Sequence, residues 1–179
     1  MDLSGRAILL TARLVLRPVE AQDATPAIAG VGQLHVSMFL AVVPHPYGPE
    51  DFASYLAIAH PGKHWAITDP NGFAGIISID PTFGFWVAPD RQGRGYATEA
   101  ACAVLATHFG DPAAGAVTSN YFVDNAVSAR VHQKLGFTET RVEDSHCRAL
   151  GQSRPLSRQR LTRADWHAHG GSAGINRMQ

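Results

Sequence analysis

The chain of 179 residues has few cysteines, a modest share of charged residues and no excess of either charge. Its two cysteines, Cys102 and Cys147, form no Cys-x-x-Cys pair and no Cys/His ligand spacing, which speaks against a disulfide framework and a zinc site. Lys plus Arg and Asp plus Glu both number 15, whereas nucleic-acid-binding proteins usually show a basic excess. We therefore expect no metal and no nucleic-acid partner.

Long apolar runs are also missing. The apolar stretch at residues 7–10 is far too short to cross a bilayer, and the first residues lack the basic leader and cleavage site of a secretory signal. The sequence thus predicts a cytoplasmic protein without a membrane partner. A share of 45% hydrophobic residues is typical of a globular domain. We expect one domain over residues 1–169 and a flexible, Gly-rich tail over residues 170–179.

Hydrophobic periodicity predicts strands that alternate with helices. The seven expected strands are residues 13–17 (an edge strand that stops at Pro18), 64–68, 73–79, 83–87, 116–122, 137–142 and 156–162. The expected helices are residues 50–60, 96–109 and 126–135, with short irregular helices between 21 and 38. Residues 69–72 indicate a hairpin turn, and Gly136 suits a helix end with positive φ. This order predicts an α+β fold with one sheet and helices on both faces.

A glycine-rich turn at residues 90–97 leads directly from an apolar strand into a helix. The first four amides of a helix have no partner within it, and the helix dipole adds positive charge at the same end. Gly93 and Gly95 let the backbone come close to a phosphate. The turn has neither the Lys-Ser/Thr pair of a P-loop nor the third glycine and acidic residue of a dinucleotide fingerprint. On its own it predicts only an anion near the helix start.

Together with other stretches, this turn resembles the GNAT acetyltransferase superfamily and, within it, the RimJ/RimL-like N-acetyltransferases. The matching stretches are residues 11–18, 84–87, 92–100, 125–128, 134–137 and 161–166, in that order along nearly the whole chain. The resemblance implies a GNAT fold, with a mixed central sheet that splays between the strands at 83–87 and 116–122. It also implies that acetyl-CoA binds in the splay as cosubstrate.

The resemblance further assigns roles to single residues. Main-chain groups near Val87 would pair with the pantetheine arm and stabilise the developing oxyanion, and Asn125 would hydrogen-bond the same arm. Ser128, one helical turn further on, would contact the thioester as the catalytic residue that protonates the leaving thiolate; its alternative is a helix-surface serine. Backbone amides would hold the pyrophosphate at Gln92, Gly93, Arg94, Gly95, Tyr96 and Ala97.

The function implied is acetyl transfer to a primary amine that attacks the thioester directly. RimJ/RimL-like sequences imply an α-amino group of a protein or peptide, and small-molecule amines or antibiotics are the alternative acceptors. The general base stays open among Asp80, His64, Glu20, Tyr121 and Glu143, because the strand before the turn has no carboxylate. That gap keeps a non-catalytic acetyl-CoA-binding module as an alternative.

Two questions remain beside these. Tyr47, Phe85 and Trp86 are candidates either for the lining of an acceptor pocket or for the core. A nucleotide-binding regulator that uses the same turn is a third hypothesis, disfavoured by the missing P-loop and acidic partners. The sequence does not fix the oligomeric state, and a homodimer stays open.

Overall fold

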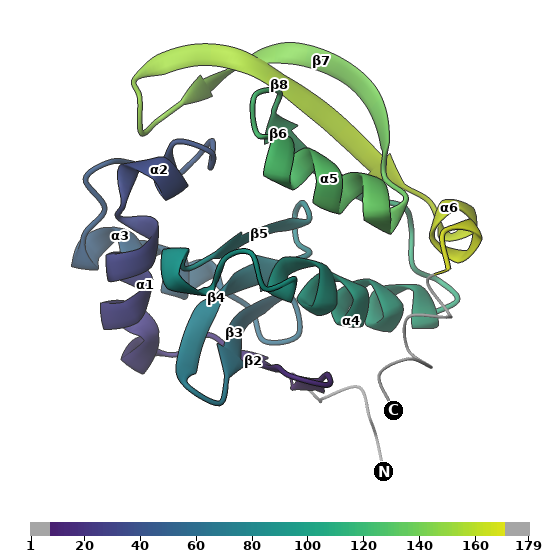
Figure 1. Cartoon of the computed structure of the whole chain (residues 1–179), viewed down its shortest axis with the longest axis horizontal. Helices are drawn as coiled ribbons and strands as arrows, with labels where there is room; N and C mark the ends of the chain where they lie inside the picture. Colours follow the sequence, from purple (N-terminus) through teal and green to yellow (C-terminus); the bar gives the residue numbers. More distant parts are fainter. Residues whose placement is uncertain (1–7, 171–179) are drawn as a thin grey trace.

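The computed structural model describes residues 8–170, and Figure 1 shows its strands and the helices around them. Five strands form an antiparallel sheet in the order β1 (Leu9–Leu10), β2 (Val15–Pro18), β3 (His64–Asp69), β4 (Gly72–Ser78) and β5 (Gly84–Val87). Three further strands form a second sheet in the order β6 (Val117–Phe122), β8 (Gln152–Leu161) and β7 (Thr138–Cys147). The helices are α1 (Ala24–Val31), α2 (Leu34–Ser37), α3 (Pro49–Ile58), α4 (Tyr96–Gly110), α5 (Ala126–Leu135) and α6 (Arg163–Ala168), with 3-10 turns at Ala21–Asp23 and Pro89–Arg91.

One parallel bridge, between Phe83 and Ser119, joins the two sheets. The Phe83 N–H donates to the carbonyl of Thr118 at 2.8 Å. Within residues 8–170, β5 and β6 share no other backbone pair, so the two parallel strands separate after this bridge. We call this feature the β5–β6 divergence. The predicted splay is confirmed, whereas the predicted single sheet is divided into two that share only this bridge.

The strands β3 and β4 pack against helices on both faces. Trp65 and Ile67 of β3 lie in the main core, which also contains the buried side of α4. Ala66, between them, lies in a second core with residues of α1 and α3. Because successive side chains of a strand point to opposite faces, this alternation places α4 on one face and α1 with α3 on the other. The expected helices on both faces are confirmed.

The C-terminal strands are longer than predicted. Instead of residues 137–142 and 156–162, β7 and β8 have 10 residues each and form one antiparallel hairpin. Most side chains of β7 are exposed, so this strand shows no apolar alternation that a sequence pattern could reveal. The prediction at this point was wrong because pairing with β8, rather than burial, extends the strand.

Two smaller differences concern the chain ends. Leu9 and Leu10 form β1 at the sheet edge, so β2 is an interior strand rather than the predicted edge strand. The helix α6 was not predicted, although Thr162 and Asp165 form the capping box that begins it. The predicted tail lies outside the described residues from position 171 on. No helix of the described chain is both long and apolar enough to span a bilayer.

Candidate functional site

The glycine-rich turn places a row of free backbone donors at the start of α4. Gly93 and Gly95 have φ values of 74° and 78°, in the left-handed region that disfavours any side chain, and Gly95 is the N-cap. Within residues 8–170, the amides of residues 93–98 donate to no protein acceptor, and the first helical bond runs from Glu99 to the Gly95 carbonyl at 3.0 Å. Such a row of donors at a helix start binds anions.

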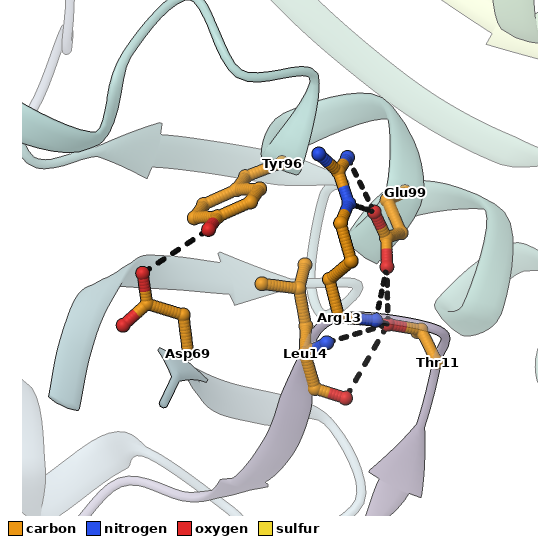
Figure 2. Close-up of polar contacts among 6 residues, drawn as sticks. All are labelled: Thr11, Arg13, Leu14, Asp69, Tyr96 and Glu99. Atoms are coloured by element: carbon orange, nitrogen blue, oxygen red, sulfur yellow. Dashed lines mark hydrogen bonds and ion pairs between the residues drawn. The ribbon is translucent and has the colours of Figure 1, made fainter. Parts of the chain in front are cut away.

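A buried carboxylate fixes this helix start against the turn between β1 and β2, as Figure 2 shows. Glu99 accepts hydrogen bonds from the Thr11 hydroxyl at 2.6 Å and from the Arg13 side-chain Nε at 2.7 Å. The Arg13 guanidinium lies over the ring of Tyr96, 5.0 Å from its centroid. Burial alone would raise the pKa of Glu99, but the hydrogen bonds from Thr11 and Arg13 outweigh it and hold that pKa below its ordinary value. The first turn of α4 is therefore anchored in an ionised network.

A second anchor holds the other side of the turn. The Tyr96 hydroxyl donates to Asp69 Oδ2 at 3.1 Å, as drawn in Figure 2, and Arg91 Nε lies 3.3 Å from the same oxygen. Asp69 belongs to the β3–β4 hairpin, so the turn is tied to two parts of the sheet. The Tyr96 side chain is thus buried, which leaves only its amide for a ligand. Arg94 is exposed and donates to the Asp90 carbonyl at 3.0 Å.

The backbone at Val87 is already partly engaged. The side-chain amide of Gln92 donates to the Val87 carbonyl at 2.9 Å, while the Gln92 N–H makes a long contact of 3.4 Å to Pro89. On its other side Val87 pairs with Gly75 of β4. A Cβ at Gly75 would lie 2.2 Å from the Trp86 carbonyl, so glycine is required for this close approach. The strand edge expected to meet a pantetheine arm therefore carries an internal hydrogen bond.

Asn125 and Ser128 lie together at the start of α5, just after β6 ends. Asn125 is the N-cap, and its side-chain oxygen accepts the N–H of Ser128 at 3.0 Å. Among the described residues, the Ser128 hydroxyl and the Asn125 side-chain N–H groups have no partner, and both residues are half-buried. These groups are free to bind a ligand, so the structure brings together the two residues that the sequence singled out here.

The three aromatic residues left open by the sequence pack against the cores and stay partly exposed. Phe85 lies against the main core on the α4 face, whereas Trp86 and Tyr47 lie against the second core with α1 and α3. They therefore belong to opposite faces of the five-stranded sheet.

The five candidates for the general base lie in different surroundings. Arg141 and Arg158 hold the pKa of Glu143 below its ordinary value through their hydrogen bonds. His64 contacts the Tyr55 hydroxyl at 3.0 Å, and burial lowers its pKa. Glu20 and Asp80 are exposed. Tyr121 lies on β6, with its ring 4.9 Å from that of His132.

Sequence reasoning missed His132. This side chain of α5 is only 2% exposed, contacts Ser119 Oγ at 2.7 Å through Nε2 and the Ser128 carbonyl at 2.8 Å through Nδ1, and burial lowers its pKa. Its position beside Val131 and one turn before Gly136 was a usable signal, because the buried stripe of α5 passes through it.

Residues 13–138 match the family model described as an acetyltransferase (GNAT) domain. Similar solved structures include RimJ of Mycobacterium smegmatis in complex with CoA-disulfide, at 22% identity and a TM-score of 0.73, covering 94% of this chain and 93% of that one. Spermidine N-acetyltransferase of Vibrio cholerae, in complex with CoA and spermine, is 16% identical with a TM-score of 0.73, covering 87% and 99%. A ribosomal-protein-S5-alanine acetyltransferase of Vibrio fischeri is 17% identical with a TM-score of 0.73, covering 89% and 98%. At these identities the structures establish a shared fold.

Proposed function

The chain belongs to the GNAT acetyltransferase family, whose cosubstrate is acetyl-CoA, and from this we propose that it acetylates the α-amino group of a protein or peptide, as a RimJ/RimL-like N-acetyltransferase. The observation that carries the proposal is the pairing of a free amide row at residues 93–98 with the β5–β6 divergence. The first suits a pyrophosphate, and the second suits an extended arm that adds to a strand edge. We take residues 1–169 as the acetyltransferase domain.

These features give the cosubstrate a direction. The pyrophosphate would lie at Gln92, Gly93, Arg94, Gly95, Tyr96 and Ala97. The pantetheine arm would follow β5 near Val87 toward the bridge, with Asn125 on its other side. The free Asn125 N–H groups and the partner-free amides support this course.

The chemistry follows from that placement. A neutral amine attacks the thioester carbonyl, and holding both reactants in one site supplies much of the rate. A backbone N–H of β5 near Val87 stabilises the oxyanion. The Ser128 hydroxyl donates its proton to the leaving thiolate and regains one from the nitrogen that has attacked, so the amide and the free thiol leave neutral. The unpartnered state of that hydroxyl supports this role.

The acceptor would approach from the face opposite α4 and α5. Those two helices pack together in the main core and cover one side of the divergence. On the other side, the segment after α2 meets the β7–β8 hairpin, where Arg148 N–H donates to the Ala41 carbonyl at 3.1 Å; Figure 1 shows α2 beside the hairpin end. We therefore place the amine between α2 and the hairpin.

The formal net charge of zero disfavours a strongly cationic acceptor such as an aminoglycoside, whose binding favours clustered carboxylates. The named relatives acetylate a ribosomal protein and spermidine. A small-molecule amine therefore stays the second candidate.

A free-thiol release assay tests the proposal. The protein is supplied with acetyl-CoA and a library of peptide N-termini and small amines. We expect thiol release with peptides, and a loss of about tenfold or more in kcat for Ser128→Ala, with Ser54→Ala, an exposed serine of α3, as the control. Thiol release with small amines alone would identify the acceptor as a small-molecule amine rather than a peptide.

The non-catalytic alternative gives a different result. Acetyl-CoA would then protect the protein from thermal unfolding, while no acceptor would release thiol. Protection by ATP or NAD instead of acetyl-CoA would indicate a nucleotide-binding regulator.

A further inference from the structure

One buried hydrogen-bond chain crosses the bridge at which β5 and β6 separate. The Ser119 hydroxyl lies 2.7 Å from the Phe83 carbonyl and 2.7 Å from His132 Nε2. His132 Nδ1 lies 2.8 Å from the Ser128 carbonyl, one helical turn earlier. The chain therefore links the last paired residue before β5, the middle of β6 and the catalytic end of α5. Its position is the base of the β5–β6 divergence.

This hydrogen-bond chain lacks one hydrogen when His132 is neutral. Three contacts of hydrogen-bond length need three hydrogens, but a hydroxyl and a neutral imidazole supply two. A carbonyl can only accept, so the neutral tautomer that bonds Ser128 carries its hydrogen on Nδ1, and the Ser119 hydroxyl then donates either to His132 Nε2 or to the Phe83 carbonyl. The other neutral tautomer would leave the Nδ1 lone pair facing the Ser128 carbonyl at 2.8 Å, which disfavours it. With an imidazolium, Nε2 donates to Ser119 and the hydroxyl hydrogen goes to Phe83. The protonation of His132 therefore sets the hydrogen bond at the Phe83 carbonyl.

The surroundings favour the neutral form without shutting the ring off from protons. Phe83 and Phe85 face the imidazole from the β5 side, and Phe137 faces it from the loop after α5. The titratable or charged groups near it are Tyr121 of β6, Glu139 of β7 and Arg130 of α5, which line one cavity of about 300 Å³ together with His132 and the uncharged Gln159 of β8. Glu139 is engaged by the Ser157 hydroxyl at 2.5 Å.

We propose that His132 is a positioning residue that acts through Ser119: it sets the hydrogen bond of the Phe83 carbonyl at the base of the β5–β6 divergence, and one proton on its imidazole rearranges that bond. The inference rests on the proposed acetyl-CoA site. In the working state near neutral pH the imidazole is neutral. Acetyl-CoA that binds in the divergence would meet the hydrogen-bond arrangement of the neutral form, so bound ligand disfavours the imidazolium. By linkage, acidification through the titration of His132 weakens acetyl-CoA binding.

The first test needs no ligand. NMR of histidine-labelled protein, with the signal assigned by its loss in His132→Gln, should show an Nδ1–H tautomer that titrates below an ordinary histidine. Ser119→Ala should shift that titration, because it removes the partner of Nε2. An ordinary titration, or one that Ser119→Ala leaves unchanged, would overturn the hydrogen-bond chain even if the protein bound no acetyl-CoA.

The second test measures acetyl-CoA affinity by calorimetry between pH 5 and 8. His132→Gln replaces the imidazole with an amide that can still hydrogen-bond but cannot titrate, and His146→Gln, at an exposed position of β7, is the matched control. We expect wild type and His146→Gln to lose about tenfold more affinity toward acid than His132→Gln, the equivalent of one hydrogen bond. The ligand's own phosphate titrates equally in all three proteins. Equal pH profiles for His132→Gln and wild type would refute the coupling, whereas absent binding at every pH would refute the proposed function.

Discussion

The two sheets use buried polar residues in different ways. Beside the five-stranded sheet, buried acids of neighbouring helices and turns each have their own cation or hydroxyl, as for Asp23 with Arg17 and Glu99 with Arg13. In the three-stranded sheet, polar side chains occupy the face under α5 itself, among them Ser119, Ser157 and Gln159. The first arrangement has one hydrogen-bond pattern and fixes the anion-binding turn. The second has hydroxyls with a choice of partner, and it meets the first at the Phe83–Ser119 bridge.

If this contrast holds, the largest loss of acetyl-CoA binding comes from the turn. Gly95→Val forces a β-branched residue into the left-handed conformation, and its side chain would meet Arg13, whose Nη2 lies 3.5 Å from a Cβ at this position. We expect affinity to fall about 100-fold, in keeping with strain of about 1–3 kcal/mol at such positions. Calorimetry with acetyl-CoA measures it.

The matched control is Gly110→Ala at the other end of α4, where a Cβ would meet no atom within 4 Å. It should bind like wild type. Equal losses in both variants would show that α4 as a whole, rather than its start, governs binding.

The anchor beneath the turn should give the next largest effect. Glu99→Gln leaves Arg13 without its anionic partner and is expected to lower the free energy of unfolding by about 1–3 kcal/mol. Because the start of α4 loosens, acetyl-CoA affinity should fall about tenfold as well. Urea unfolding and calorimetry measure the two effects, with Glu50→Gln, an exposed acid of α3, as control. A loss of stability with unchanged affinity would separate the anchor from the site.

A substitution in the three-stranded sheet should affect binding of the acceptor without affecting binding of acetyl-CoA. Arg154 of β8 donates to the Met38 carbonyl at 2.6 Å, which ties the hairpin to the segment after α2. It also lies over the ring of Phe122 of β6 and pairs with the exposed Asp124 at 2.6 Å. Arg154→Met should cost about 1–2 kcal/mol of stability and raise the acceptor KM several-fold, while acetyl-CoA affinity stays within about twofold of wild type. Arg160→Met, an exposed arginine of the same strand, is the control. A large drop in acetyl-CoA affinity would show that the three-stranded sheet also contributes to cosubstrate binding.

The smallest expected effect is a difference in acid sensitivity. Burial lowers the pKa of His132 below its unfolded value, so its contribution to stability is present above the unfolded value of 6.5 and is lost as the pH falls toward the folded pKa. Glu99, also lowered, loses its contribution only at more acidic pH, below its unfolded value of 4.5. The melting temperature, followed from pH 7.5 to about 3, should therefore fall in two stages, and His132→Gln should reduce the first. A first stage unchanged in that variant would assign it to groups other than His132, such as His64, whose pKa burial also lowers.

Local features of the sequence predicted most of the five-stranded sheet and the start of α4 well. The glycine turn, the helix start at Tyr96 and the hairpin at residues 69–72 each depend on backbone conformations that few residue types adopt, so their residues identify them. The β5–β6 divergence came from the family resemblance, because a missing strand pair leaves no pattern in either strand.

The full length of β7 and the site at His132 were not predicted, and the reason is physical. The exposed side chains of β7 carry no periodic signal, and the strand exists because β8 pairs with it. The spacing of α5 places His132 on its buried stripe, but only the approach of Ser119 from β6 makes it part of a site. Contacts between distant segments decide these features, and a single sequence does not show them.

The hydrogen bond from Gln92 to the Val87 carbonyl has a consequence for how affinity is distributed along the cosubstrate. An incoming pantetheine N–H that takes this carbonyl exchanges one hydrogen bond for another, and the net gain is the small difference between two terms of about 1 kcal/mol. The strand edge then selects ligands that can form this hydrogen bond but adds little to the affinity. Most of the affinity must then come from contacts with the phosphates. An acyl-pantetheine that lacks the nucleotide should therefore be a poor acyl donor for this protein.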